Sequence, residues 1–195
     1  MQPIASRNNR DPLGWCLVVT ALFFILALWR ISTPGAYYFD EVHYVPASLK
    51  MLKLIPTNRE HPLFGKEVIA AFIHVLGDRP LAWRLGPLLL GTAGLFAFGR
   101  LVWHASHRRR ATITAIVLLA TNFMWFVQSR IAMLDMIEAG LCMIALWQFA
   151  AALGARTTRA ARLRLAAAGI AMGLSLGAKW SSAPALVMPG LCFFV

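Results

Sequence analysis

Apolar residues form five long runs that are separated by short polar connections. The runs cover residues 14–29, 83–103, 111–127, 133–154 and 165–178, and a sixth run begins near residue 183. Each of the five is close to the roughly 20 residues that a helix needs to cross a hydrocarbon core about 30 Å thick. Because an isolated segment satisfies its backbone polar groups in lipid only as a helix, the pattern predicts an all-α, multi-pass membrane protein.

Basic residues are concentrated in two of the connections, "HRRR" at 107–110 and "RTTRAARLR" at 156–164. The two connections share one side of the membrane if each run between them crosses once, and the positive-inside rule makes that side cytoplasmic. The same orientation predicts a cytoplasmic tail at residues 1–13 and an extracytoplasmic loop at residues 32–82.

The loop at residues 32–82 contains two shorter helical patterns. Its first apolar residues recur at helical spacing, at Val42, Val45, Leu49 and Leu52. This spacing predicts a short helix that lies on the membrane surface. The segment "EVIAAFIHVLG" at 67–77 is too short to cross, so it predicts a second interfacial or re-entrant helix.

Glycines and cysteines within the runs predict packing rather than chemistry. Glycine recurs at every fourth position, at Gly169, Gly173 and Gly177. Such a stripe lets another helix approach closely. The three cysteines lie in apolar runs, as is typical of packed free thiols, and they are Cys16, Cys142 and Cys192.

Composition supports the membrane assignment and limits the partners. The chain is 59% hydrophobic and 14% charged, against roughly 25% charged residues in soluble domains. The net charge of +11 would suggest a nucleic-acid partner for a soluble protein. Here the basic surplus belongs to the predicted cytoplasmic side, so no nucleic-acid partner is expected. The last residues, "PGLCFFV", lie inside an apolar run, and we expect the chain to be the N-terminal part of a longer protein.

Ionisable residues that the membrane pattern does not require gather on the predicted outer side. They occur in "FDEVHY" at 39–44, "REHPLFGK" at 59–66, "RIAMLDMIE" at 130–138 and "AKW" at 178–180, and at Arg84. Each group also has a purely structural explanation. Asp40 and Glu41 could cap a helix that starts there, and His61 could belong to a loop turn.

The cations of this outer set have structural explanations of their own. Lys66, Arg84, Arg130 and Lys179 could extend to lipid phosphates. An Arg130–Asp135 ion pair would explain a carboxylate at the start of a span, where ionisable groups are costly unless they are paired or functional. Acidic and basic residues occur together on the outer side, however. This combination favours a shared role in the chemistry of an anionic substrate that is carried by a lipid.

A sugar linked to a lipid through phosphate fits this set of residues. The phosphate is already a good leaving group, so cleavage of the sugar–oxygen bond needs cations where negative charge accumulates rather than a general acid. An acceptor hydroxyl needs a carboxylate to take its proton. Asp40 and Glu41 cannot point the same way, because neighbours lie about 100° apart on a helix, so one should act and the other support it.

The outer motifs resemble those of the protein O-mannosyltransferases, which are polytopic enzymes with the GT-C glycosyltransferase fold. The resemblance rests on "FDEVHY", "HPLFGK", "WRLGPLLLG" and "RIAMLDM", in this order along nearly the whole chain. Of these, the His-Pro-x-x-Gly-Lys element is the most specific. The chain departs from the family at Leu63 and Phe64, where a second proline and a leucine are common.

The resemblance implies transfer of mannose, with inversion, from a polyprenyl-phosphate (dolichyl-phosphate) mannose to Ser or Thr hydroxyls of secreted proteins. It implies that Asp40 is the base, that Glu41 positions the acceptor and that Arg84 lies near the donor phosphate. The softer substrate-binding assignments are His61, Lys66, Arg130 and Asp135. No metal or other cofactor is expected. Association with the secretion translocon is a further possibility that the resemblance raises.

Two other functions remain open at the level of sequence. A related GT-C enzyme could move aminoarabinose or arabinose from its lipid carrier to lipid A or to a cell-wall glycan. The chain could also be a fragment of a membrane transporter, although its ionisable groups lie at the outer ends of the runs rather than at mid-depth. The predominance of arginine over lysine and the abundance of alanine suggest a bacterial plasma membrane, with the site facing away from the cytoplasm.

Overall fold

The computed structural model describes residues 10–57 and 60–191, and in these residues it contains helices and no strands. The all-α prediction is therefore confirmed. The helices are α1 (Leu13–Leu28), α2 (Glu41–Leu52), α3 (Phe64–Leu76), α4 (Pro80–Ser106), α5 (Arg109–Ala120), α6 (Phe123–Gln128), α7 (Leu134–Leu153), α8 (Thr158–Ala178), the 3-10 turn η1 (Trp180–Ser182) and α9 (Ala183–Leu191).

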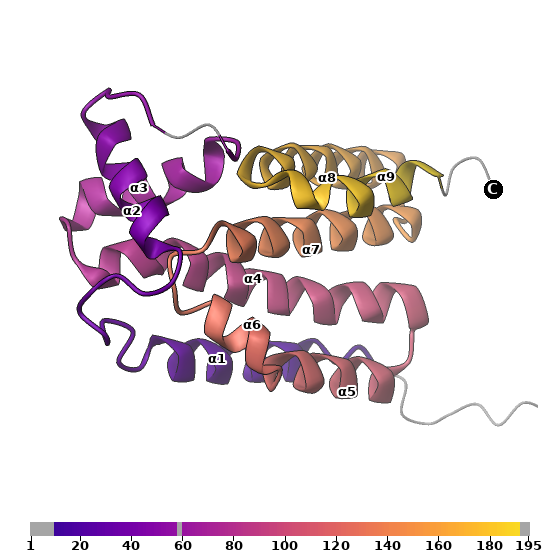
Figure 1. Ribbon diagram of the computed structural model, residues 1–195. Helices are drawn as coiled ribbons and strands as arrows, with labels where there is room; N and C mark the ends of the chain where they lie inside the picture. The colour runs from indigo at the N-terminus through magenta and orange to yellow at the C-terminus, as the bar shows by residue number, and fades with distance from the viewer. Residues whose placement is uncertain (1–9, 58–59, 192–195) are drawn as a thin grey trace, which may run out of the picture.

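The long helices run side by side as a bundle, and the short helices α2 and α3 gather at one end of it (Figure 1). The start of α4 and the connection between α6 and α7 lie at this same end. The connection between α4 and α5 and the connection between α7 and α8 lie at the opposite end, as predicted from the basic segments at 107–110 and 156–164. The predicted outer polar segments are therefore brought to one end of the molecule.

Helices α4 and α7 are the only described helices long and apolar enough to cross a membrane by length and hydropathy. Helix α1 is apolar but has only 16 residues. Helix α8 begins at Thr158, before the predicted start at residue 165, and its first turns carry arginines. Its N-terminus is fixed by the Thr157 hydroxyl, which accepts a hydrogen bond from the Ala160 N–H at 3.2 Å.

The run at 111–127 is not one continuous helix, because the structure divides it into α5 and α6. The break falls at Thr121 and Asn122. The Asn122 side chain accepts a hydrogen bond from the Trp125 N–H at 3.0 Å and so caps the new helix. Asparagine competes for backbone groups within a helix and is favoured at helix N-caps, which explains why a helix ends and another begins here.

Close helix packing occurs between α4 and α7 rather than along the predicted glycine stripe of α8. A Cβ atom added at Gly94 would lie 2.7 Å from the Cα atom of Gly140, so both positions need glycine. Gly169 and Gly173 have no described atom within 4 Å of such a Cβ. The face of α8 that is buried in the bundle carries other small residues, which are Ala168, Ala171, Ser175 and Ala178.

The two interfacial helices predicted in the first long loop are present as α2 and α3 and pack against each other. The Ser48 hydroxyl of α2 donates to the Lys66 carbonyl of α3 at 2.9 Å. Cys16 and Cys142 are buried free thiols, as predicted. Cys192 lies outside the described residues. These two helices hold the polar segments of the loop over the end of α4 and α7.

Candidate active site

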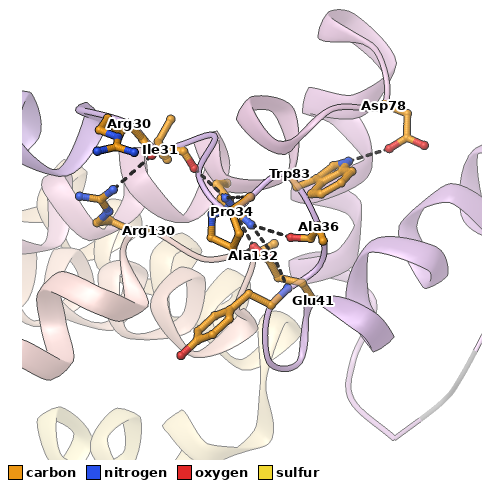
Figure 2. A network of polar contacts seen from close by, with 11 residues as sticks. Arg30, Ile31, Pro34, Ala36, Glu41, Asp78, Trp83, Arg130 and Ala132 are labelled. Atoms are coloured by element: carbon orange, nitrogen blue, oxygen red, sulfur yellow. Dashed lines mark hydrogen bonds and ion pairs between the residues drawn. The ribbon is translucent and has the colours of Figure 1, made fainter.

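Glu41 begins α2 and is fully buried, with four hydrogen bonds to its carboxylate (Figure 2). Its Oε1 accepts from the Arg84 Nε at 2.7 Å and from the Ala132 N–H at 2.8 Å. Its Oε2 accepts from the Arg84 Nη2 at 2.7 Å and from the Tyr38 N–H at 2.9 Å. These contacts join α2, α4 and the segment before α7, so the carboxylate has a structural role.

Arg84 is 1% exposed and uses all five of its N–H groups within the described residues. Besides Glu41, its guanidinium donates to the carbonyls of Ile31 (2.7 Å), Pro34 (2.9 Å) and Ala36 (3.3 Å). A bidentate arginine–carboxylate pair of this kind is strong and directional. A direct contact between Arg84 and a phosphate would require Arg84 to release Glu41 or a loop carbonyl.

Asp40 immediately precedes the buried Glu41 but is only half-buried. It occupies the N-cap position of α2, yet its side chain makes no capping hydrogen bond. Within residues 10–57 and 60–191, nothing forms a hydrogen bond or an ion pair with its carboxylate. The two carboxylates therefore diverge as helix geometry predicts, and Asp40 is the one that is open to a reactant.

Tyr44 lies one turn after Asp40 on α2, and its ring is 6% exposed. Burial, as the largest cause, and the charges of the carboxylates of Asp40, Asp135 and Glu60 together raise the pKa of its hydroxyl to about 12. Its ring centroid lies 6.3 Å from that of His61. The Tyr44 hydroxyl is therefore neutral at physiological pH.

Asp135 pairs with Lys179 rather than with Arg130, so the predicted alternative of an Arg130–Asp135 ion pair is wrong. The Lys179 Nζ lies 2.6 Å from Asp135 Oδ1. The other carboxylate oxygen, Oδ2, is buried without a hydrogen-bond partner. Lys179 follows the last residue of α8, and Asp135 lies in the first turn of α7, so the pair joins two helix ends that are distant in sequence.

Arg130 lies beside the Glu41–Arg84 pair, on the wall of a cavity of about 220 Å³ that Tyr38 and Arg84 also line. Its Nη2 donates to the Trp29 carbonyl at 3.0 Å. It also donates to the Arg30 carbonyl at 3.3 Å (Figure 2). Burial lowers the pKa of Arg130, and the neighbouring guanidiniums of Arg84 and Arg30 lower it further. Positive charge is therefore in excess around this cavity.

Lys66 and His61 are adjacent, as the predicted motif requires. Lys66 is fully buried, and its Nζ donates to the His61 carbonyl at 3.2 Å. Burial lowers the pKa of Lys66, while Glu60 acts in the opposite direction. The Nδ1 of His61 is buried without a hydrogen-bond partner. The described residues include no group of three or more His, Cys, Asp or Glu side chains placed to hold a metal ion.

The structure thus divides the predicted site residues into three groups. Glu41 and Arg84 form one saturated pair. Asp40, His61 and Asp135 lie near Tyr44, and Lys66 is next to His61. Arg130 lies at the cavity that it shares with Arg84.

Two residues of this site are missing from the sequence-based set. Tyr44 follows Asp40 by four positions, the spacing that places two side chains on the same helix face. Lys179 belongs to the outer "AKW" segment, but its partner Asp135 is 44 residues away, so the pairing has no local signal.

The family described as Dolichyl-phosphate-mannose-protein mannosyltransferase matches residues 80–195, more than half of the chain. A Polyprenol-phosphate-mannose--protein mannosyltransferase of Mycobacterium tuberculosis is 30% identical over 148 residues, which is 68% of the chain. A protein of the same name from Mycolicibacterium smegmatis is 28% identical over 210 residues, which is 97% of the chain. The chain spans only 28% and 40% of the length of these two relatives, respectively.

The fold has a counterpart among solved structures. The crystal structure of ArnT from Cupriavidus metallidurans in the apo state matches with a TM-score of 0.69 at 25% identity, over 85% of this chain and 33% of the ArnT chain. This likeness confirms the predicted GT-C fold of a membrane protein. Together with the family match, it confirms the resemblance drawn from the outer motifs: the chain belongs to the dolichyl-phosphate-mannose–protein mannosyltransferase family.

Proposed function

We propose that this chain supplies the base and part of the donor site of an enzyme that transfers mannose from a polyprenyl-phosphate mannose to Ser or Thr hydroxyls of proteins. One observation carries the proposal. Of two adjacent carboxylates, Glu41 accepts four hydrogen bonds and Asp40 is open. The names of the relatives support the donor and the protein acceptor.

In the proposed reaction, Asp40 takes the proton of the acceptor hydroxyl as its oxygen attacks the anomeric carbon of mannose. The bond from that carbon to the phosphate oxygen breaks, and its electron pair leaves with the polyprenyl phosphate. The phosphate thus gains one negative charge, which a preorganised cation stabilises. Attack from the face opposite the leaving group inverts the configuration of the sugar carbon.

We place the phosphate at Arg130 rather than at Arg84. Two of the nitrogens of Arg130, Nε and Nη1, make no described hydrogen bond, and the cavity beside it carries excess positive charge. Arg84 instead keeps Glu41 and the 31–36 segment in place, which fixes the first turn of α2 and therefore Asp40. Arg84 thus acts as a positioning residue.

The test is transfer by the complete protein in sealed membrane vesicles. Polyprenyl-phosphate mannose is offered with a Ser/Thr peptide, and polyprenyl-phosphate arabinose and a glycan acceptor are the comparisons. We expect mannosyl peptide from the first pair. Because we propose that the site faces away from the cytoplasm in a bacterial plasma membrane, an impermeant peptide should be modified only in right-side-out vesicles. Transfer to the glycan alone, or of arabinose alone, would overturn the proposed substrates.

A further inference from the structure

The surface next to Asp40 combines side chains from three separate helices. Tyr44 lies one turn along α2 from Asp40, so the two share a helix face. The core cluster that holds the Tyr44 ring also contains Leu134 and Ala178. These two residues directly precede Asp135 and Lys179, and the Asp135 carboxylate is near enough to Tyr44 for its charge to raise the tyrosine pKa.

Several polar atoms on this surface lack a partner. Asp135 Oδ2 and His61 Nδ1 are both buried, and neither has a hydrogen bond. Lys179 has three N–H groups, and only its contact with Asp135 engages them within the described part of the chain. Most buried polar atoms in proteins are hydrogen-bonded, so unpartnered ones next to a reactive carboxylate indicate a ligand.

The mixture of donors and acceptors identifies the kind of ligand. Lys179 and Tyr44 offer N–H and O–H donors, while Asp135 and Asp40 offer carboxylate acceptors. A phosphate would only accept hydrogen bonds, and both carboxylates would repel it. Neighbouring hydroxyl groups of a sugar each donate one hydrogen bond and accept others, so they satisfy both kinds of partner.

We propose that Tyr44, Asp135 and Lys179 bind hydroxyl groups of the transferred sugar and so determine which sugar the enzyme accepts. This inference rests on the proposed function, because it assigns the sugar of that reaction to a place beside Asp40. The phosphate then lies toward Arg130, on the other side of the anomeric carbon from the attacking hydroxyl. Tyr44 acts as a donor throughout the physiological range, because its hydroxyl is not ionised there.

The experiment compares the complete wild-type enzyme with Tyr44→Phe, which removes one hydroxyl and keeps the packed ring. Both enzymes are given polyprenyl-phosphate mannose and its 2-, 3-, 4- and 6-deoxy analogues. The matched control is Tyr37→Phe, because the Tyr37 ring packs against Trp83, with 4.6 Å between the ring centroids and a tilt of 52°, outside the proposed subsite. The unfolding midpoint of each variant is measured alongside kcat/KM.

We expect Tyr44→Phe to lower kcat/KM for the mannose donor by about 10-fold or more, the effect of one lost hydrogen bond at a buried site. With the wild-type enzyme, kcat/KM for one deoxy analogue should be lower than for the mannose donor by a similar factor. With Tyr44→Phe, kcat/KM should be the same for that analogue and for the mannose donor. Tyr37→Phe should behave as the wild type with every donor. If Tyr44 served folding alone, Tyr44→Phe would lower kcat/KM for all donors by one common factor.

The outcomes separate this inference from the proposed function. If the effect of Tyr44→Phe on kcat/KM multiplies with the effect of every deoxy position, no sugar hydroxyl contacts Tyr44 and that contact is overturned. Equal kcat/KM for all deoxy donors with the wild type overturns the whole subsite, and this test needs no variant that folds. A wild-type enzyme that transfers no lipid-linked sugar overturns the proposed function instead.

Discussion

The Glu41–Arg84 pair and the surface formed by Asp40, Tyr44, Asp135 and Lys179 begin at adjacent residues of one helix, yet they differ in how many of their polar atoms have partners. In the first, four hydrogen bonds occupy the carboxylate and five N–H groups of the arginine are used. In the second, Asp135 and Lys179 form one ion pair, and the buried Asp135 Oδ2 has no hydrogen-bond partner.

This difference separates the residues that build the site from those that react. Buried ionic groups with every donor and acceptor used have no capacity left for a ligand. Removing one member, however, leaves an uncompensated buried charge. Open groups contribute little to folding and remain available to a substrate. Changes in the first region should therefore alter stability, and changes in the second should alter turnover.

The largest expected effect comes from breaking the saturated pair. Arg84→Met leaves Glu41 buried without its cation and frees three loop carbonyls. The free energy of unfolding should fall by about 3–5 kcal/mol, seen as a lower unfolding midpoint of the complete protein in detergent. Arg79→Met, at an exposed position just before α4, serves as the control. An unchanged midpoint for Arg84→Met would show that the pair has no structural role.

A smaller effect should follow from removing the cation at the second cavity. Arg130→Gln takes away positive charge where the leaving phosphate gains negative charge. We expect kcat/KM for the lipid donor to fall by about 10- to 100-fold, with an unfolding midpoint near that of the wild type. Arg79→Gln should keep wild-type kinetics. If Arg130→Gln also keeps them, the phosphate lies elsewhere.

The smallest effect concerns a pair at the opposite end of the bundle. Asp11 pairs with Arg100 through contacts of 2.5 and 2.8 Å, and its side chain is 44% exposed. Asp11→Asn should therefore cost less than about 1 kcal/mol of stability. Hydrogen bonds from Arg100 hold the pKa of Asp11 below its ordinary value of 3.8.

The pH dependence of the Asp11 effect has a definite sign. A lowered pKa in the folded state gives stability that is fully present above pH 3.8 and is lost as the pH falls through the folded pKa. The difference in unfolding midpoint between wild type and Asp11→Asn should narrow below that pH. A difference that grows there would contradict this assignment.

Much of the architecture is predictable because it depends on local patterns. Apolar runs and their basic connections predict the helices and their two ends, and the spacing of Val42, Val45 and Leu49 predicts α2. The break at Asn122 is harder to predict, because one capping residue interrupts a continuous apolar run. The predicted packing of Gly169 and Gly173 is absent from the described part of the chain, where Gly94 and Gly140 make the close approach.

The site is predictable in its residue types and only partly in its contacts. Helix geometry predicts that Asp40 and Glu41 diverge, since adjacent side chains lie about 100° apart. Which of the two is buried depends on Arg84 and the Ala132 N–H, which lie 43 and 91 residues from Glu41. The Asp135–Lys179 pair depends in the same way on the packing of α7 against α8.

The most direct test compares two isosteric substitutions at adjacent positions, Asp40→Asn and Glu41→Gln, in the complete protein. Mannosyl transfer and the unfolding midpoint are measured in the same preparations. We expect Asp40→Asn to lower kcat by about 10²-fold or more at an unchanged midpoint, as loss of a general base does, and Glu41→Gln to lower the midpoint. Wild-type turnover by Asp40→Asn would show that Asp40 is not the base. A lowered midpoint for Asp40→Asn with an unchanged one for Glu41→Gln would show that Asp40, and not Glu41, is the structural carboxylate.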